Sequence, residues 1–359
     1  MLKKFLEKNK LNAFWVSSEE NIFYILSSTS KGKEELITKD SKILFTKDKT
    51  FIFAHPLEII SLKKYLSIKK AEILSLEKKT LKAIIDKEKI KKIGFEKNHL
   101  TVWQLENLQK IWGKKIILKG YFEVIEEIRT QKKIMEINKI KSSANLTDKV
   151  LQTSLPFIKE GISEKKLALI LQNIGQEKGA QKAFDFIVAF GKNSACPHHL
   201  PSFKKLTKNE AILIDLGFKK NQYLSDLSRS FFLGSPSQEW LKIFQLVIKA
   251  QKKAIKTIKI KQNCNESFKK VKKVFTSQRK GKYFSHALGH GLGLCIHEKP
   301  HISPRSKEVF EKNMVFSLEP GIYLPQKFGI RIEDIFALTH QGLRQLSKFP
   351  KNIENMILN

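Results

Sequence analysis

Residues 211–227 read AILIDLGFKKNQYLSDL, so two apolar runs, each carrying one aspartate, flank a short polar stretch. Such runs predict strands, and the polar stretch predicts a chain reversal about Lys220 and Asn221. Folding there places Asp215 and Asp226 face to face across an antiparallel pair, where opposed Cβ atoms lie about 5 Å apart. A buried carboxylate is unfavourable unless it is paired or binds a metal ion. The segment therefore predicts a hairpin whose two aspartates share a cation.

A second stretch, residues 314–336, repeats this arrangement. It reads MVFSLEPGIYLPQKFGIRIEDIF and places Glu319 and Glu333 on either side of a turn near Gln326. Two acidic hairpins that open on one interior offer it four carboxylates. The alternative, surface acids on edge strands, does not explain why apolar residues flank each acid.

A histidine adds a fifth candidate ligand. Residues 286–293 read HALGHGLG, and His290 lies between glycines that allow close backbone approach, although a simple loop is the alternative. Four carboxylates with one imidazole form a hard ligand set that favours manganese, while cobalt, iron(II) and zinc also bind such sets. His297 lies seven residues after His290. On a regular strand the two rings would face opposite sides, so both reach one site only if the chain bends at Gly291 or Gly293.

The chain length and its patterning indicate two domains, because 359 residues are many for a single core. Residues 1–124 predict a small α/β domain, with a helix at 57–66 and short strands at 12–16, 41–45, 50–54 and 91–96. Residues 125–359 predict two helices, a hairpin, two more helices and another hairpin, which is a duplicated α+β unit. Ser163 is the expected N-cap of the second of these helices.

The net charge of +32 is the most conspicuous bulk property of the chain. The excess is almost all lysine, with only six arginines, and it is spread from end to end. Proteins that read nucleic acids usually place arginine at bases and phosphates. The pattern therefore favours a compositional bias over a specific nucleic-acid partner, with weak binding to polyanions at low salt expected in either case.

Compartment and membrane signals are few. No apolar stretch approaches the length of a membrane span, and the basic N-terminus lacks the apolar core of a signal peptide. Cys196, Cys264 and Cys295 form no metal or redox pattern, and so sparse a set is typical of a reducing cytosol. We expect a cytoplasmic protein with no membrane partner.

Seven motifs in order now define a resemblance that covers nearly the whole chain. The chain resembles the creatinase/aminopeptidase ("pita-bread") metallopeptidases, in their Xaa-Pro aminopeptidase and prolidase branch. The motifs are PHHLPS at 197–202, IDLG at 214–217, SDLSR at 225–229, HALGHGLG at 286–293, HEKP at 297–300, LEPGIY at 318–323 and GIRIED at 329–334. The resemblance implies an α+β fold. A creatinase-type N-terminal domain, residues 1–124, precedes a pita-bread catalytic domain, residues 125–359, with a pseudo-twofold antiparallel sheet and flanking helices.

The resemblance also implies how two divalent cations would be held. Asp215 chelates the first ion, His290 and Glu319 hold the second, and Asp226 and Glu333 bridge both. A hydroxide shared by the two ions then attacks the scissile carbonyl.

The same resemblance implies roles for residues around the ions. Glu319 moves the proton to the leaving nitrogen, and His198 and His297 bind substrate and donate to the carbonyl as negative charge develops. His286 lines the leaving-group pocket, with a packing role as its alternative. Arg331 lies behind the ligands, where it either clamps the His297–Glu298 dipeptide or orients Glu333.

The expected activity is that of an Xaa-Pro aminopeptidase, which removes the first residue of peptides with proline in second position. An Xaa-Pro dipeptidase (prolidase) is the alternative, because the two share every metal ligand. Methionine aminopeptidase and creatine hydrolysis fit the chain less well. A catalytically inactive member of the fold that binds nucleic acid or protein would be expected to have lost ligands, and all five positions are filled here. The resemblance also implies a homodimer.

Overall fold

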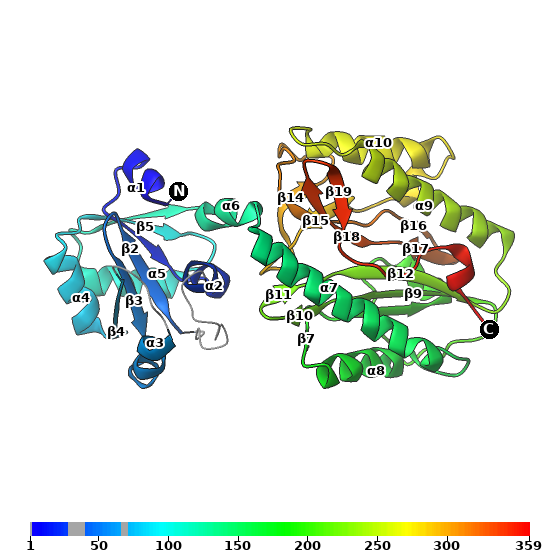
Figure 1. Ribbon diagram of the computed structural model, residues 1–359, viewed down its shortest axis with the longest axis horizontal. Coiled ribbons are helices and arrows are strands. Elements are labelled where there is room, and N and C mark those ends of the chain that lie inside the picture. The colour runs from blue at the N-terminus through cyan, green and yellow to red at the C-terminus, as the bar shows by residue number, and fades with distance from the viewer. Residues whose placement is uncertain (1, 28–39, 66–70) are drawn as a thin grey trace. The chain divides into compact units, whose positions relative to one another are not determined.

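A computed structural model describes residues 2–27, 40–65 and 71–359 (Figure 1). The chain divides into two compact units, Met1–Arg129 and Thr130–Asn359. Among the described residues, no helix combines the length and the apolar character that a membrane crossing requires.

A six-stranded sheet, in the order β4-β3-β2-β1-β5-β6, forms the centre of the first unit (Figure 1). Its strands include all four that the sequence predicts, while β4 and β6 were not predicted. Apolar clusters cover both faces: Trp15 packs with Phe53 and Trp112 on one, and Phe14 with Ile22 on the other. The strands are β1 Ala13–Val16, β2 Lys42–Thr46, β3 Thr50–Ala54, β4 Ala71–Ser75, β5 Lys92–Glu96 and β6 Ile117–Tyr121. The helices are α1 Leu2–Lys8, α2 Glu19–Ser27, α3 Ile59–Tyr65, α4 Lys78–Lys87, α5 Val102–Trp112 and α6 Val124–Thr130.

Two helix pairs flank the strands of the second unit (Figure 1). They are α7 Ile134–Ser154 with α8 Glu164–Glu177, and α9 Gln238–Thr257 with α10 Cys264–Thr276. As predicted, the side chain of Ser163 caps α8 by accepting a hydrogen bond from the amide of Lys166. Helix α7 packs on β10 and β11, and α9 packs on β16 and β17. One large apolar cluster forms the core of this unit, and a smaller one consists of Ile187, Ala189, Leu213 and Tyr323.

The strands of the second unit form four sheets. Their orders are β20-β12-β9-β8, β14-β13-β15-β18-β19, β11-β10-β7 and β16-β17. The first strands are β7 Gln181–Lys182, β8 Ile187–Phe190, β9 Glu210–Leu216, β10 Phe218–Lys220, β11 Tyr223–Leu224 and β12 Leu227–Leu233. The later ones are β13 Gly289–Gly291, β14 Glu298–Ile302, β15 Val315–Leu318, β16 Gly321–Leu324, β17 Phe328–Arg331, β18 Asp334–Thr339, β19 Gly342–Gln345 and β20 Ile357–Leu358. A helix pair followed by antiparallel strands thus occurs twice, which is the predicted α+β architecture.

The first acidic hairpin forms, but its register differs from the prediction. Asp215 pairs with Ser228, and Asp226 lies in the break between β11 and β12. The break follows from local packing. The hydroxyl of Ser225 accepts from the amide of Phe218 and donates to its carbonyl, and a Cβ at Gly217 would lie 2.1 Å from the Ser225 carbonyl oxygen. The pairing register is the same on both sides of this break, since Leu216 pairs with Leu227 and Lys219 with Leu224. The two aspartates are not directly opposed because the turn is centred on Asn221 and Gln222, both with positive φ, one residue later than predicted.

The second acidic hairpin has the predicted register. Leu318 pairs with Asp334 and Gly321 pairs with Arg331, so Glu319 lies opposite Glu333 between these two pairs. The turn contains Gln326, whose φ of 60° lies in the left-handed region. The predicted bend near His290 is also present, as a register shift between His290 and Gly291.

Candidate metal centre

The five predicted ligands come from five separate points of the second unit. Asp215 is the penultimate residue of β9, Asp226 lies between β11 and β12, and His290 is in the middle of β13. Glu319 lies between β15 and β16, and Glu333 between β17 and β18. Four of the five residues are buried, and Glu319 is partly exposed. The ends and breaks of strands thus gather acidic groups that are far apart in the sequence.

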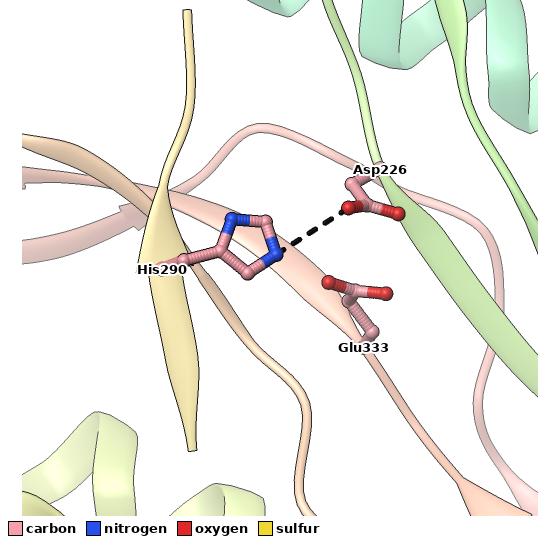
Figure 2. Close-up of side chains that lie close together, drawn as sticks. All are labelled: Asp226, His290 and Glu333. Carbon is pink, nitrogen blue, oxygen red and sulfur yellow. Dashed lines mark ion pairs between the residues drawn. The ribbon is translucent and has the colours of Figure 1, made fainter. Parts of the chain in front are cut away.

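Three of these side chains converge closely (Figure 2). Asp226, His290 and Glu333 each offer one ligand atom, and these atoms all lie within 4.8 Å of one another. The Nε2 atom of His290 lies 3.6 Å from Asp226 Oδ2 and also 3.6 Å from Glu319 Oε1. Asp215 is close enough for its negative charge to raise the pKa of Asp226, Glu319 and Glu333. The structure therefore brings all five predicted ligands into one cluster.

The protonation state of His290 is the one that a metal ligand requires. Burial, together with the nearby His297, lowers the pKa of its imidazole to about 4, so the ring is neutral at pH 7. Its Nδ1 lies 3.1 Å from the carbonyl oxygen of Gly291, which only accepts hydrogen bonds. Nδ1 therefore carries the proton, and the lone pair of Nε2 faces the carboxylates.

The carboxylates fit a divalent cation because the protein leaves them unsatisfied. Asp215 Oδ1, Asp226 Oδ1 and Glu333 Oε1 are buried without a hydrogen-bond partner among the described residues. Burial and neighbouring acids raise the pKa of Asp226 and of Glu333, and burial raises the pKa of Glu319 to about 8. Crowded acids of this kind are stable in their ionised form only beside positive charge. The residues present thus fit a hard divalent cation.

One arginine connects the two acidic hairpins. The Nη2 of Arg331 donates to Asp215 Oδ2 at 2.5 Å, and its Nε donates to the hydroxyl of Ser228 at 2.8 Å. That hydroxyl donates in turn to Glu333 Oε2 at 2.9 Å, so Arg331 reaches Glu333 through Ser228. The structure places Lys132, rather than Arg331, against Glu298, at 3.0 Å. Arg331 therefore orients ligands from both hairpins.

His286 is held by a hydrogen-bonded chain. Its Nδ1 donates to the carbonyl of Ala287 at 2.7 Å, so its Nε2 accepts from the hydroxyl of Tyr323 at 2.9 Å. The same hydroxyl accepts from Arg331 Nη1 at 2.7 Å. Burial, with the charge of Arg331, lowers the pKa of His286 to about 3, so the ring is neutral. His286 thus has a fixed orientation beside Glu319, whose Oε2 lies 3.8 Å from its Nδ1.

The two remaining histidines are exposed beside this cluster. The ring of His297 contacts that of His290 edge-on, with centroids 4.4 Å apart, so the bulge in β13 does bring both to one site. His198 is exposed, and its charge lowers the pKa of both His286 and His297 in addition to the larger effect of burial. The carbonyl of Pro197 accepts from Arg331 at 3.2 Å. Both exposed histidines are therefore accessible to a molecule that reaches the acidic cluster.

Several polar residues of this centre were not predicted individually. Tyr323 and Ser228 lie inside quoted motifs. The contact of Ser228 with Arg331 joins positions 103 residues apart, whereas Tyr323 contacts Arg331 from eight residues away on the same hairpin. Lys132 carries no local signal, and the HEKP motif that contains Glu298 does not indicate this pairing. Only the folded chain shows these pairings.

A cluster of buried carboxylates around a neutral histidine in a duplicated α+β fold defines a metallohydrolase. The family model for metallopeptidase family M24 matches residues 138–340, and the model for the creatinase/prolidase N-terminal domain matches residues 1–131. The chain belongs to the M24 metallopeptidases. The resemblance seen in the motifs and the pita-bread fold are both confirmed.

Named relatives of this family match the chain from end to end. An Xaa-Pro dipeptidase from Pyrococcus horikoshii is 32% identical over 98% of this chain and 96% of its own length. The solved structure of an Xaa-Pro dipeptidase from Bacillus anthracis superposes with a TM-score of 0.92 at 27% identity, covering 99% of this chain and 98% of that one. An X-Pro aminopeptidase from Thermotoga maritima superposes with a TM-score of 0.87 at 28% identity, covering 97% of each chain.

Proposed function

We propose that this M24 metallopeptidase is an Xaa-Pro dipeptidase that works with two divalent cations, manganese being the preferred ion. The observation that carries the proposal is the convergence of Asp226, His290 and Glu333, where buried carboxylate oxygens have no hydrogen-bond partner in the described part of the chain. Glu319 Oε1 lies 3.6 Å from His290 Nε2 in the same cluster. Dipeptidases predominate among the similar named proteins, which favours this activity over the aminopeptidase activity expected from the sequence. An Xaa-Pro aminopeptidase remains the second candidate, because one solved neighbour has that name.

In this proposal the five side chains divide between two ions. Asp215 would hold the first, His290 and Glu319 would hold the second, and Asp226 and Glu333 would contribute to both. When bound, the ions polarise the scissile carbonyl and lower the pKa of a water molecule. Arg331 keeps Asp215 directed into the site, and Ser228 does the same for Glu333.

The residues around the ligands would handle the substrate. Glu319 is the group that takes a proton and passes it to the leaving nitrogen. Proline in a peptide bond has no N–H, so this nitrogen needs a proton when it leaves. His198 and His297 donate hydrogen bonds to the carbonyl oxygen as negative charge develops there. His286, fixed by Tyr323, forms the wall on the leaving-group side.

The test compares three substrates: a dipeptide Xaa-Pro, its C-terminal amide and a tripeptide Xaa-Pro-Xaa. Each is incubated with the protein in added manganese and then after removal of metal with a chelator. A dipeptidase cleaves the free dipeptide and neither of the others, because recognition of the free carboxylate excludes them. Cleavage of the tripeptide would move the assignment to aminopeptidase. Failure to cleave any of the three with manganese, cobalt or zinc would overturn the Xaa-Pro proposal.

Two further properties belong to this proposal. We expect a homodimer, which sedimentation velocity of the purified protein would detect. We also expect a cytoplasmic location, a proposal that the sparse, odd-numbered set of three cysteines supports because such a set is typical of a reducing compartment.

A further inference from the structure

A buried carboxylate outside the metal centre gathers an unusual number of donors. Glu164, the first residue of α8, is fully buried. Its Oε1 accepts from the amide of Phe190 at 2.8 Å and from the side chain of Asn193 at 2.9 Å. Its Oε2 accepts from the amide and hydroxyl of Ser202, at 2.9 and 2.5 Å, and lies 2.8 Å from His199 Nε2. Five donors thus meet on one side chain.

These donors span one segment, residues 190–202. Phe190 ends β8, Asn193 lies in a 3-10 helix at Gly191–Ala195, and Ser202 is the last donor along the chain. His198 lies within this segment. The carbonyl of the preceding residue, Pro197, accepts a hydrogen bond from Arg331, and the following residue, His199, contacts Glu164. Both neighbours of His198 are therefore fixed while its own ring stays exposed.

The charge on Glu164 matters for this arrangement. Burial raises its pKa, but the hydrogen bonds from Ser202, His199, Phe190 and Asn193 outweigh that effect, and its pKa lies below the ordinary value. The N-terminal end of α8 also favours a negative charge in its first turn. An ionised carboxylate accepts on both oxygens, whereas an amide would direct N–H groups at existing donors. No neutral group of the same size could hold all five donors.

We propose that Glu164 is a positioning residue for the peptidase reaction, which holds segment 190–202 so that His198 stands beside the metal centre. This inference rests on the proposed function, in which His198 contacts the substrate carbonyl. Glu164 itself acts only through the segment that it holds. Its loss therefore displaces the ring of His198 without removing any metal ligand.

The first test is a mutant cycle on Xaa-Pro hydrolysis. Glu164→Gln is expected to lower kcat about 100-fold with little change in KM, because a displacement of about 1 Å can have that effect. When Glu164→Gln is added to His198→Ala, kcat should fall almost no further, because the imidazole that Glu164 positions is already absent. Additive losses in the double variant would overturn the proposal. Glu164→Asp keeps the charge and should retain intermediate activity, and it serves if the amide variant folds poorly.

Glu177→Gln is the matched control, because Glu177 is the exposed last residue of the same helix. It should leave both kcat and the exchange measurement described next unchanged.

The second test needs no activity. Hydrogen–deuterium exchange of peptides covering residues 190–202 is compared between wild type and Glu164→Gln, both free of metal. We expect faster exchange across this segment in the variant, and equal exchange would overturn the proposal even if the enzyme acts on a different substrate. Conversely, if the wild-type protein cleaves no Xaa-Pro peptide while Glu164→Gln still exchanges faster across the segment, the result counts against the proposed function and not against the anchoring by Glu164.

Discussion

The buried carboxylates of this protein are of two kinds, those whose oxygens are satisfied by hydrogen-bond donors and those in the candidate metal centre that keep an oxygen unsatisfied within the described part of the chain. In the first unit, Glu96 is buried and accepts from the amides of Ser17 and Ser18 and from the side chain of Asn21, at 2.6–2.8 Å. In the second unit, Asp226 and Glu333 each keep a buried oxygen with no partner among the described residues. The first arrangement is complete without a ligand, whereas the second is complete only with a cation.

The comparison teaches that burial alone does not identify a functional acid. Burial raises the pKa of Glu96, and its donors lower it. Burial raises the pKa of Asp226 and Glu333 as well, but there the nearest charged groups are further acids, which raise it more. Unsatisfied oxygens surrounded by like charge are the sign of a metal site.

Replacing a bridging ligand should have the largest effect. Glu333→Gln removes a negative charge from the cluster, so we expect manganese-dependent hydrolysis to fall about 100- to 1,000-fold, as removal of a catalytic electrostatic group does. The metal-free variant should unfold at a higher temperature than metal-free wild type, because one of several repelling buried charges is gone. Activity assays and thermal unfolding in chelator measure the two effects. A metal-free variant less stable than wild type would contradict the account.

Arg331→Lys should have the next largest effect. Lysine can approach Asp215, but it cannot also donate to Ser228, Tyr323 and the Pro197 carbonyl as the guanidinium does. We expect about a 10- to 100-fold loss of metal affinity or activity, as for other residues that orient ligands. Arg344→Lys, at an exposed position, is the control and should behave as wild type. Unchanged manganese affinity and unchanged kcat would show that Arg331 is not needed for ligand orientation.

Glu96→Ala tests the claim that the satisfied carboxylate stabilises the fold without a cation. It leaves the donors of Ser17, Ser18 and Asn21 without their acceptor, and each buried unsatisfied group costs about 1–3 kcal/mol. We expect a destabilisation of at least that size in denaturant unfolding, of the same magnitude with and without manganese. A change that depended on manganese would mean that the two kinds of carboxylate are not independent.

The smallest expected effect is the pH dependence of the stability that the His99–Glu126 pair contributes. His99 Nε2 and Glu126 Oε1 lie 3.1 Å apart. The hydrogen bond to Glu126 raises the pKa of His99 above 6.5. Burial raises the pKa of Glu126, but hydrogen bonds from His99 and Asn21 outweigh it and bring it to about 2. The contribution of His99 to the free energy of unfolding is complete below pH 6.5 and is lost as the pH rises through its raised pKa. The contribution of Glu126 is complete above the ordinary pKa of a glutamate and is lost as the pH falls towards 2.

His99→Gln should therefore destabilise the protein more at pH 5.5 than at pH 9. Both side chains are partly exposed, so we expect a difference below about 1 kcal/mol. Denaturant unfolding of wild type and variant at the two pH values measures it. A larger loss at pH 9 would contradict the assigned pKa direction.

The sequence predicted the parts of the centre that depend on local pattern. The register of the second hairpin follows from a single turn near Gln326, and the bulge at His290 follows from the seven-residue spacing and the glycines. The first hairpin deviates because its turn is centred on Asn221 and Gln222 and not on Lys220 and Asn221, a shift of one residue that alternation does not encode.

Other features depend on long-range packing and were beyond the sequence. Strands β4 and β6 lie at the two edges of their sheet and were missed there, since edge strands are less uniformly apolar. Glu164 looks like an ordinary helix-start acid until the fold brings segment 190–202 against it. Neither the pairing of Arg331 with Asp215 nor that of Lys132 with Glu298 has a sequence signal.

The central claim is that the unsatisfied acids around His290 hold divalent cations, and calorimetric titration of metal-free protein with manganese tests it most directly. The account predicts two bound ions per chain for wild type and Glu96→Ala, and fewer or much weaker binding for Glu333→Gln. No binding by the folded wild-type protein, or equal binding by Glu333→Gln, would contradict it.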